Sequence, residues 1–182
     1  MRRDRDDLEK VIKTKEEIQK RVEELGLQLA NEYEGCNPVV LGILKGANVF
    51  MADLVRAMDI ELQMDFMVLG SYGLADKPGE VEIKKDCETD LAGRHVLVVD
   101  DIADTGQTLK TLAAMLKKRG AASVKSCVLL DKPARRTVDF VPDYIGFEIE
   151  DAFVVGYGLD YAERFRNLPE VCAVKKHVYG AE

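Results

Sequence analysis

The stretch from His95 to Leu109 constrains the fold more than any other part of the chain, because its character changes within a few residues. Residues 96–99 are apolar and mostly β-branched, which is typical of a strand buried on both faces of a parallel sheet. Residues 100–108 bring three aspartates, two threonines and a glycine, and residues 109–116 have the spacing of an amphipathic helix. The sequence therefore predicts a strand, a polar turn and a helix within an α/β fold.

The polar turn is expected at the carboxyl end of a central strand, where open α/β sheets bind their ligands. Unpaired amides of residues 105–108, at a helix N-terminus, suit a phosphate group. Asp100 and Asp101 suit ribose hydroxyls and Mg²⁺, a hard cation that prefers oxygen ligands. Asp104 is placed to act as a general acid or base. In the alternative interpretation, the first two acids only end the strand and Asp104 caps the helix.

The length, composition and charge of the chain limit which class of protein it can be. A chain of 182 residues with 47% apolar residues is long enough for one domain with a real core. A net charge of -7 argues against nucleic acid as the default partner. The N-terminus carries no signal peptide pattern and no apolar run approaches membrane-spanning length, so we expect a cytoplasmic protein. Four cysteines without CxxC spacing predict reduced thiols: Cys36, Cys87, Cys127 and Cys172.

The N-terminal half predicts further elements around the same sheet edge. Thr14 and Glu17 fit a capping box that begins a helix running to about Tyr33. Residues 39–44 form a second buried strand, which is followed by Lys45 and Gly46 and then by a helix. This turn brings a cation and an unhindered backbone amide towards the acids, although Gly46 could instead serve only a tight turn.

Three later segments are also predicted from their patterns. Residues 62–69 read as a strand, and a glycine-punctuated loop over residues 70–79 follows it. Residues 122–130 form another strand that ends next to Lys132, a position where a solvated lysine would be the ordinary outcome. Phe153 offers a surface on which a base could stack, whereas a phenylalanine in an apolar run is by default a core residue.

The apolar strand, two acids, two small residues and Asp-Thr-Gly-x-Thr together resemble the phosphoribosyl-diphosphate signature of the type I phosphoribosyltransferases. The resemblance implies a central, mostly parallel sheet flanked by helices, with a small hood formed by the N- and C-terminal segments. Over the single domain of residues 1–182, the hood would take about residues 1–35 and 150–182, and the core about residues 36–149. The implied ligands of phosphoribosyl diphosphate and its 5′-phosphate are Asp100, Asp101, Ala103, Asp104, Thr105, Gly106, Gln107 and Thr108.

The segments around Lys132 and residues 153–166 narrow this resemblance to the hypoxanthine-guanine phosphoribosyltransferases in their compact bacterial form. It implies that Lys45, Gly46 and Arg166 hold the pyrophosphate, and that Ser71 and Tyr72 begin a lid that excludes water from the reacting sugar. The implied contacts to the purine base are Lys132, Phe153, Val154 and Asp160. The implied ligands of Mg²⁺ are Asp100, Asp101 and Asp160.

The implied activity is purine salvage: transfer of the 5-phosphoribosyl group to N9 of hypoxanthine or guanine, which gives IMP or GMP and pyrophosphate. Asp104 would manage the proton on purine N7, and Mg²⁺ would assist the departure of pyrophosphate. The resemblance also implies a homodimer or homotetramer. Two alternatives stay open, an RNA-binding regulator of pyrimidine operons on the same fold and a transferase for another base such as xanthine.

Overall fold

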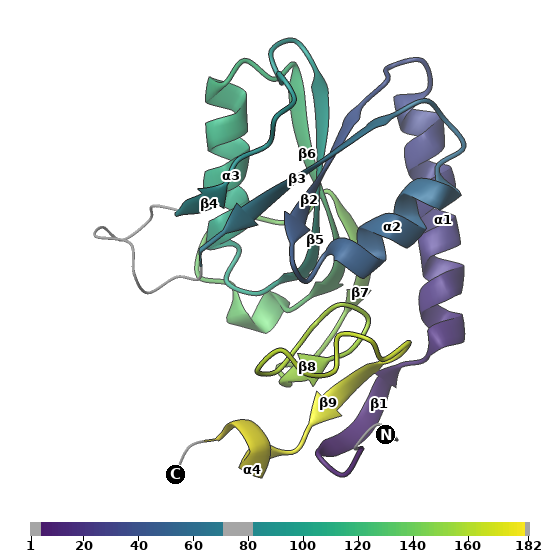
Figure 1. The fold of residues 1–182 in the computed structure, drawn as a ribbon, viewed down its shortest axis with the longest axis vertical. Coiled ribbons are helices and arrows are strands. Elements are labelled where there is room, and N and C mark those ends of the chain that lie inside the picture. Colours follow the sequence, from purple (N-terminus) through teal and green to yellow (C-terminus); the bar gives the residue numbers. More distant parts are fainter. Residues whose placement is uncertain (1–4, 71–81, 181–182) are drawn as a thin grey trace.

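The computed structural model describes residues 5–70 and 82–180. Two sheets organise this part of the chain (Figure 1). The first half of the chain contributes β1 (Leu8–Lys13), α1 (Lys15–Tyr33), β2 (Val39–Leu44), α2 (Asn48–Ala57), β3 (Gln63–Leu69) and β4 (Ile83–Lys85). The second half contributes β5 (His95–Ala103), α3 (Gln107–Lys118), β6 (Ser123–Asp131), the 3₁₀ turn η1 (Pro133–Arg135), β7 (Tyr144–Glu148), β8 (Val154–Val155), β9 (Val171–Val174) and α4 (Lys176–Tyr179).

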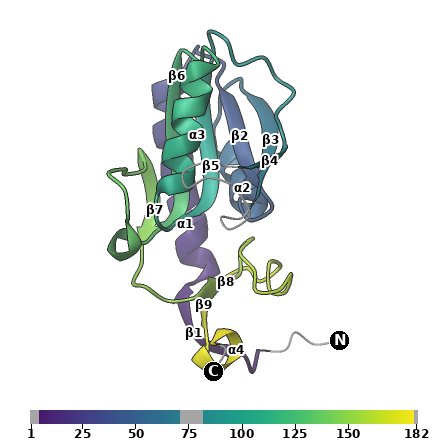
Figure 2. The same ribbon diagram turned by 90° about the vertical axis from the view of Figure 1, so that its left-hand side faces the viewer.

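The larger sheet has six strands in the order β4-β3-β2-β5-β6-β7. All neighbouring pairs are parallel except β3 and β4, so the predicted mostly parallel sheet is confirmed. The central strand β5 is apolar on both faces, with residues 96–99 buried. Helices α1 and α2 cover one face of this sheet and α3 covers the other, and each side has its own hydrophobic cluster (Figures 1 and 2).

Local sequence signals explain where the flanking helices begin. Thr14 Oγ1 accepts a hydrogen bond from the amide of Glu17, and the Glu17 carboxylate accepts one from the amide of Thr14. This reciprocal pair is the predicted capping box, and α1 ends at Tyr33 as expected. Within the described residues no helix combines the length and the apolar character that crossing a membrane would require.

The smaller sheet, with the order β1-β9-β8, joins the two ends of the chain. β1 pairs antiparallel with β9, and β9 pairs antiparallel with β8. Figure 1 shows this sheet below the carboxyl ends of the core strands, next to the loop between β8 and β9. The N- and C-terminal strands therefore form a hood over the sheet edge, whereas the exact boundaries of hood and core given above stay a prediction.

Candidate active site

The chain order of the sheet reverses between β2 and β5. β3, which follows β2 in sequence, lies on one side of this pair, and β6, which follows β5, lies on the other. The crevice at such a reversal, beyond the carboxyl ends of the strands, is where ligands bind in open α/β sheets. The loop after β2 and the turn after β5 both open into it, and these are the two segments that carry the predicted phosphate-binding residues.

The turn after β5 presents the N-terminus of α3. Gly106 precedes the helix with φ +80°, a left-handed conformation that residues with a Cβ rarely adopt. Thr105 Oγ1 accepts a hydrogen bond of 3.3 Å from the amide of Gln107. Asp104 makes no cap to α3, since no side chain caps this helix, so the interpretation of Asp104 as a helix cap is wrong. The remaining first-turn amides can meet an anion.

A cavity of about 110 Å³ lies directly against this turn. Its lining combines the predicted acids with the residues that begin the helix. A larger cavity of about 580 Å³ lies elsewhere, between α1, α2 and residues 157–169, and touches the predicted site only through Arg166. The smaller cavity is lined by Asp100, Ile102, Ala103, Asp104, Thr105, Gly106, Thr108 and Leu109.

Asp100 and Asp101 form a strained electrostatic pair at the end of β5. Burial raises the pKa of Asp100 well above its ordinary value, and the negative charge of Asp101 raises it further. Burial also raises the pKa of Asp101, against the opposing effects of a hydrogen bond from Asp100 and the charge of Arg166. A cation or a set of hydroxyl donors would relieve this repulsion, so the pair is suited to bind one.

The backbone of Gly46 lies so close to this pair that no larger residue would fit there. A Cβ built on Gly46 would come 1.6 Å from Asp101 Oδ2, well inside contact distance. The requirement for glycine is therefore a close approach of backbone to carboxylate rather than a tight turn alone. The preceding peptide bond, between Leu44 and Lys45, is cis.

The acid pair fits Mg²⁺ in the manner usual for this ion, which is held by one or two carboxylates and completed by water and substrate phosphates. Among residues 5–70 and 82–180 no group of three or more His, Cys, Asp or Glu side chains is arranged to hold a metal. Both carboxylate oxygens of Asp160 are engaged within its own loop, by Arg166 Nη2 at 2.8 Å and by the amide of Glu163 at 2.8 Å. The role of Asp160 as a metal ligand stays a prediction.

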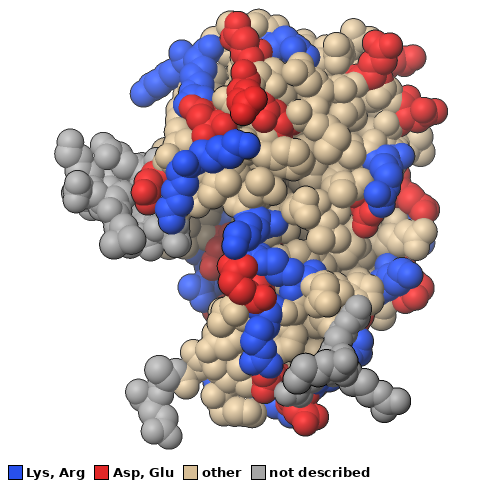
Figure 3. Space-filling view, in the orientation of Figure 1, with Lys and Arg blue, Asp and Glu red and all other residues tan. Residues whose placement is uncertain are grey.

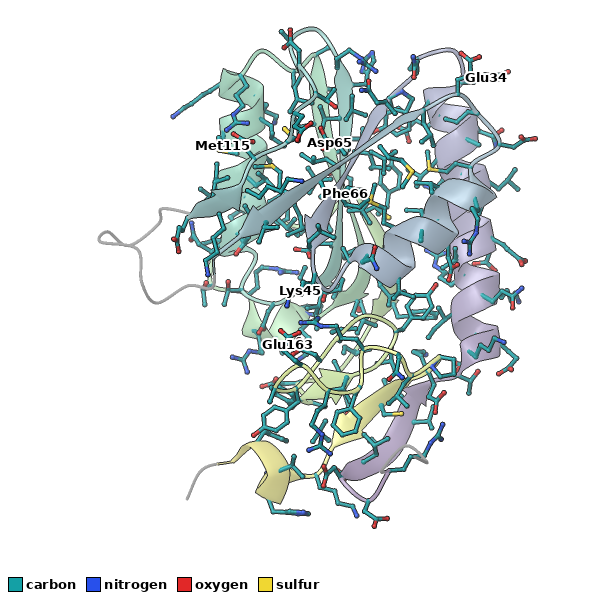
Figure 4. The ribbon with its side chains drawn as sticks, viewed as in Figure 1. Glu34, Lys45, Asp65, Phe66, Met115 and Glu163 are labelled. Carbon is teal, nitrogen blue, oxygen red and sulfur yellow. The ribbon has the colours of Figure 1, made fainter. Side chains whose placement is uncertain are left out.

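The loop between β8 and β9 brings a basic cluster to the same crevice. Lys45 Nζ lies 3.1 Å from Glu163 Oε2, and Figure 4 shows these two side chains facing each other between core and hood. Arg166 Nη1 donates to the carbonyl of Gly158 at 2.8 Å. Its buried Nε has no hydrogen-bond partner among the described residues. Lys45, Gly46 and Arg166 are thus brought to one place, as a pyrophosphate site requires.

Lys132 lies beside Asp104 because β5 and β6 are adjacent and in register at their ends. Ala103 pairs with Asp131, and the amide of Lys132 donates to the carbonyl of Ala103 at 3.0 Å. The Lys132 side chain is only 8% exposed, so the interpretation of a solvated lysine is wrong. Its nearest carboxylate oxygen, on Asp151, is 3.9 Å away. Burial lowers the pKa of Lys132, and the charges of Asp104 and Asp151 oppose this effect.

Arg135 is a neighbour of the site that the sequence analysis missed. Its Nε lies 2.7 Å from Asp104 Oδ1, and its Nη1 lies 3.4 Å from Asp151 Oδ1. The contact to Asp104 is an ion pair without hydrogen-bond alignment, because Asp104 Oδ1 has no hydrogen-bond donor among the described residues. The two consecutive arginines after Lys132 in the sequence were the available signal.

Phe153 and Val154 lie in the hood. The Phe153 ring stacks on Tyr179 with centroids 4.7 Å apart and meets Tyr161 edge-on at 5.6 Å. Val154 is buried and pairs with Ala173 in the small sheet. The contacts of both residues with a base stay predictions, and the proposed lid residues Ser71 and Tyr72 lie outside the described residues.

Charges of both signs mark the boundary of core and hood. On the face shown in Figure 3, basic and acidic side chains are interspersed across the middle of the molecule. This arrangement differs from the one-signed basic stripe expected of a nucleic-acid-binding surface. It is what a site with acids for a cation and basic residues for phosphates would present.

The sequence and the fold both match known proteins. Residues 10–162 match the family model described as the phosphoribosyl transferase domain. The chain is 51% identical to a hypoxanthine-guanine phosphoribosyltransferase of Bacillus subtilis, over 95% of this chain and 97% of the relative. A hypoxanthine phosphoribosyltransferase structure from Staphylococcus aureus superposes with a TM-score of 0.91 at 45% identity and covers 96% of each chain. A hypoxanthine phosphoribosyltransferase structure from Trypanosoma cruzi superposes with a TM-score of 0.90 at 38% identity. The superposition covers 98% of this chain and 97% of that one.

Proposed function

The chain belongs to the hypoxanthine-guanine phosphoribosyltransferases of the phosphoribosyltransferase family, and from this premise we propose that it transfers the 5-phosphoribosyl group of phosphoribosyl diphosphate to N9 of hypoxanthine or guanine. The products are IMP or GMP and pyrophosphate. The single observation that carries the proposal is the adjacency of Asp104 and Lys132 at the ends of β5 and β6. The Asp104 carboxylate and the Lys132 ammonium come from neighbouring strand ends, so one purine could meet Asp104 through N7 and Lys132 through its 6-oxo group.

The sugar donor fits the residues around β5. The turn of residues 104–108 offers amides to the 5′-phosphate, with Gly106 giving the backbone its required conformation. Asp100 and Asp101 accept hydrogen bonds from ribose hydroxyls or bind a cation that carries the diphosphate. Lys45 and Arg166 supply the positive charge for the pyrophosphate, and the Gly46 amide lies beside Asp101.

The base is selected by Lys132. Its buried ammonium donates a hydrogen bond to a 6-oxo group, whereas the 6-amino group of adenine would meet it donor to donor. Phe153 provides a stacking face and Val154 a backbone edge. The carboxylate of Asp160 accepts from the 2-amino group of guanine once its contacts within the loop rearrange.

The reaction follows from these positions. Purine N9 attacks C1′ as the bond from C1′ to the pyrophosphate oxygen breaks, and the proton on N7 passes to the Asp104 carboxylate. Acid–base assistance of this kind is worth about 10²–10⁴-fold, or roughly 3–5 kcal/mol. Positioning and electrostatic stabilisation account for the rest of the rate acceleration, as in other transfers with loose transition states. Mg²⁺ held by Asp100 and Asp101 would offset part of the negative charge of the diphosphate and make it a better leaving group.

The ion pair between Arg135 and Asp104 belongs to the ligand-free enzyme. Asp104 is 41% exposed on its side chain, so an incoming base can reach it. Arg135 lies against the Asp104 carboxylate as its counter-charge until the base arrives. We also propose the cytoplasm as the location of the enzyme and a homodimer or homotetramer as its assembly, in line with the family.

Incubating the protein with Mg²⁺, phosphoribosyl diphosphate and each of hypoxanthine, guanine, xanthine and adenine tests the proposal. IMP and GMP should form, and AMP should not. Product from xanthine alone would assign the chain to another base. Absence of any nucleotide, together with tight RNA binding in a filter assay at moderate salt, would support the regulatory alternative.

A further inference from the structure

The segment after β6 folds against the turn of residues 104–108, which we call the phosphate turn. The amide of Thr137 donates to the carbonyl of Thr105 at 3.1 Å, and Arg136 lies beside Gly106. A Cβ built on Gly106 would come 2.8 Å from Arg136 Cδ. Neither Arg136 nor Thr137 lines the cavity against the phosphate turn, so both hold the backbone of this turn from outside that cavity.

Arg136 makes two directed contacts from this position. Its Nη1 donates to the backbone carbonyl of Asp104 at 2.8 Å, and its Nη2 pairs with Asp131 Oδ1. Asp131 is 2% exposed and ends β6. The Arg136 side chain is 14% exposed. A guanidinium fork fixed at both ends in this way is rigid, because each end is bonded and little solvent competes.

The ion pair also determines where the charge of Arg136 acts. A lone arginine beside a ring of free amides would turn towards a bound phosphate. Asp131 instead pairs with the guanidinium at the end of β6 and balances its charge. Taking away either partner would leave the other buried without its counter-charge, which is costly in a low-dielectric setting.

We propose that Asp131 and Arg136 are positioning residues that lock the phosphate turn and the Asp104 backbone in the conformation that binds the 5′-phosphate. The inference rests on the function proposed above and assigns these residues a role in it. Neither residue lines the cavity beside the phosphate turn, and Arg136 contacts the turn itself, so both act through the backbone of the turn. Their loss is expected to weaken ligands that carry a 5′-phosphate and to leave the free base little affected.

The variants Asp131→Asn and Arg136→Met test the inference, with Arg94→Met as the matched control. Arg94 Nη2 likewise donates to a backbone carbonyl, that of Asn37, but at the amino end of β5. The measurements are KM for phosphoribosyl diphosphate, KM for hypoxanthine, Kd for IMP and the thermal midpoint. Both variants should raise KM for phosphoribosyl diphosphate and Kd for IMP about tenfold or more, with KM for hypoxanthine within about twofold.

The control should keep wild-type KM and Kd values even where its thermal midpoint falls, which separates positioning from general destabilisation. Wild-type affinity for phosphoribosyl diphosphate in Asp131→Asn would overturn the inference. Tighter binding in that variant would also overturn it, because it would mean that Arg136 binds the phosphate directly once released. Should the wild-type protein itself form no nucleotide, the proposed function fails instead, and the two failures are distinct.

Discussion

Replacing Lys132 with methionine is expected to stabilise the ligand-free enzyme while removing its ability to choose an oxo-purine. The Lys132 ammonium is buried, with its nearest carboxylate oxygen 3.9 Å away, too far for a hydrogen bond. Burial lowers its pKa, which means that folding disfavours the charged form. A methionine of similar length would keep the packing and remove this electrostatic cost.

The expected changes in stability and in activity follow from the ligand-free enzyme and from the substrate complex, respectively. Replacing a buried charge by a hydrophobic side chain is neutral or stabilising by about 1–4 kcal/mol. For a chain of this size, each kcal/mol corresponds to about 2–4 °C in Tm. In the complex, a charged hydrogen bond to the 6-oxo group is worth about 1.5–3 kcal/mol. Its loss should therefore lower kcat/KM for hypoxanthine by about 10–150-fold.

The pH dependence has a definite sign. Because the pKa of Lys132 is lowered below the ordinary value of 10.5, the unfolded chain binds more protons than the folded one in the interval between the two values. Wild-type stability should therefore gain an increment as the pH rises through that interval. The methionine variant should lack this increment.

Thermal melts over pH 7–10.5 and initial rates with hypoxanthine and adenine provide the assay, with Lys110→Met as the control. Lys110 is exposed on α3, so the same substitution there should leave both the stability and the rates unchanged. A Lys132→Met variant that melts below the wild type, or one that retains wild-type kcat/KM for hypoxanthine, would refute the reasoning.

Two further substitutions probe the acid pair. Gly46→Ala should raise KM for phosphoribosyl diphosphate at least about tenfold in initial-rate assays. The reason is that the new Cβ would come 1.6 Å from Asp101 Oδ2 and displace the carboxylate. An unchanged KM would contradict this, because it would show that the loop adapts freely. Asp100→Asn should raise Tm at pH 8 by about 2–4 °C, the equivalent of about 1 kcal/mol, while lowering turnover. The raised pKa of Asp100 makes wild-type stability fall as pH rises from the unfolded value of about 3.9 through the folded value, and asparagine avoids this loss. Equal melting curves for wild type and variant across pH 4–8 would contradict that explanation.

Most elements of the core could be predicted from local sequence patterns. The β-branched run of β5 and the Thr14–Glu17 capping box are short-range signals, and both are confirmed. The position of the predicted phosphate turn followed from the change of pattern after β5. The approach of Gly46 to Asp101 was not predictable in its geometry, since it depends on how two neighbouring strands end.

The pairing of segments that are distant in the sequence was the main feature that local patterns could not predict. The pairing of β1 with β9 joins residues from opposite ends of the chain, and neither strand has a turn signal linking it to the other. The contacts of Arg135 and Arg136 with Asp104 likewise cross from one strand end to the next. Their sequence showed only a basic pair, which is indistinguishable from a solvated surface.

Turnover of Asp104→Asn tests the central claim most directly. The substitution keeps the size of the side chain and removes the base that accepts the N7 proton. With hypoxanthine, phosphoribosyl diphosphate and Mg²⁺, kcat should fall by about two orders of magnitude or more, and Kd for phosphoribosyl diphosphate should change little. A variant that forms IMP at nearly the wild-type rate would contradict the account, because proton transfer would then not depend on Asp104.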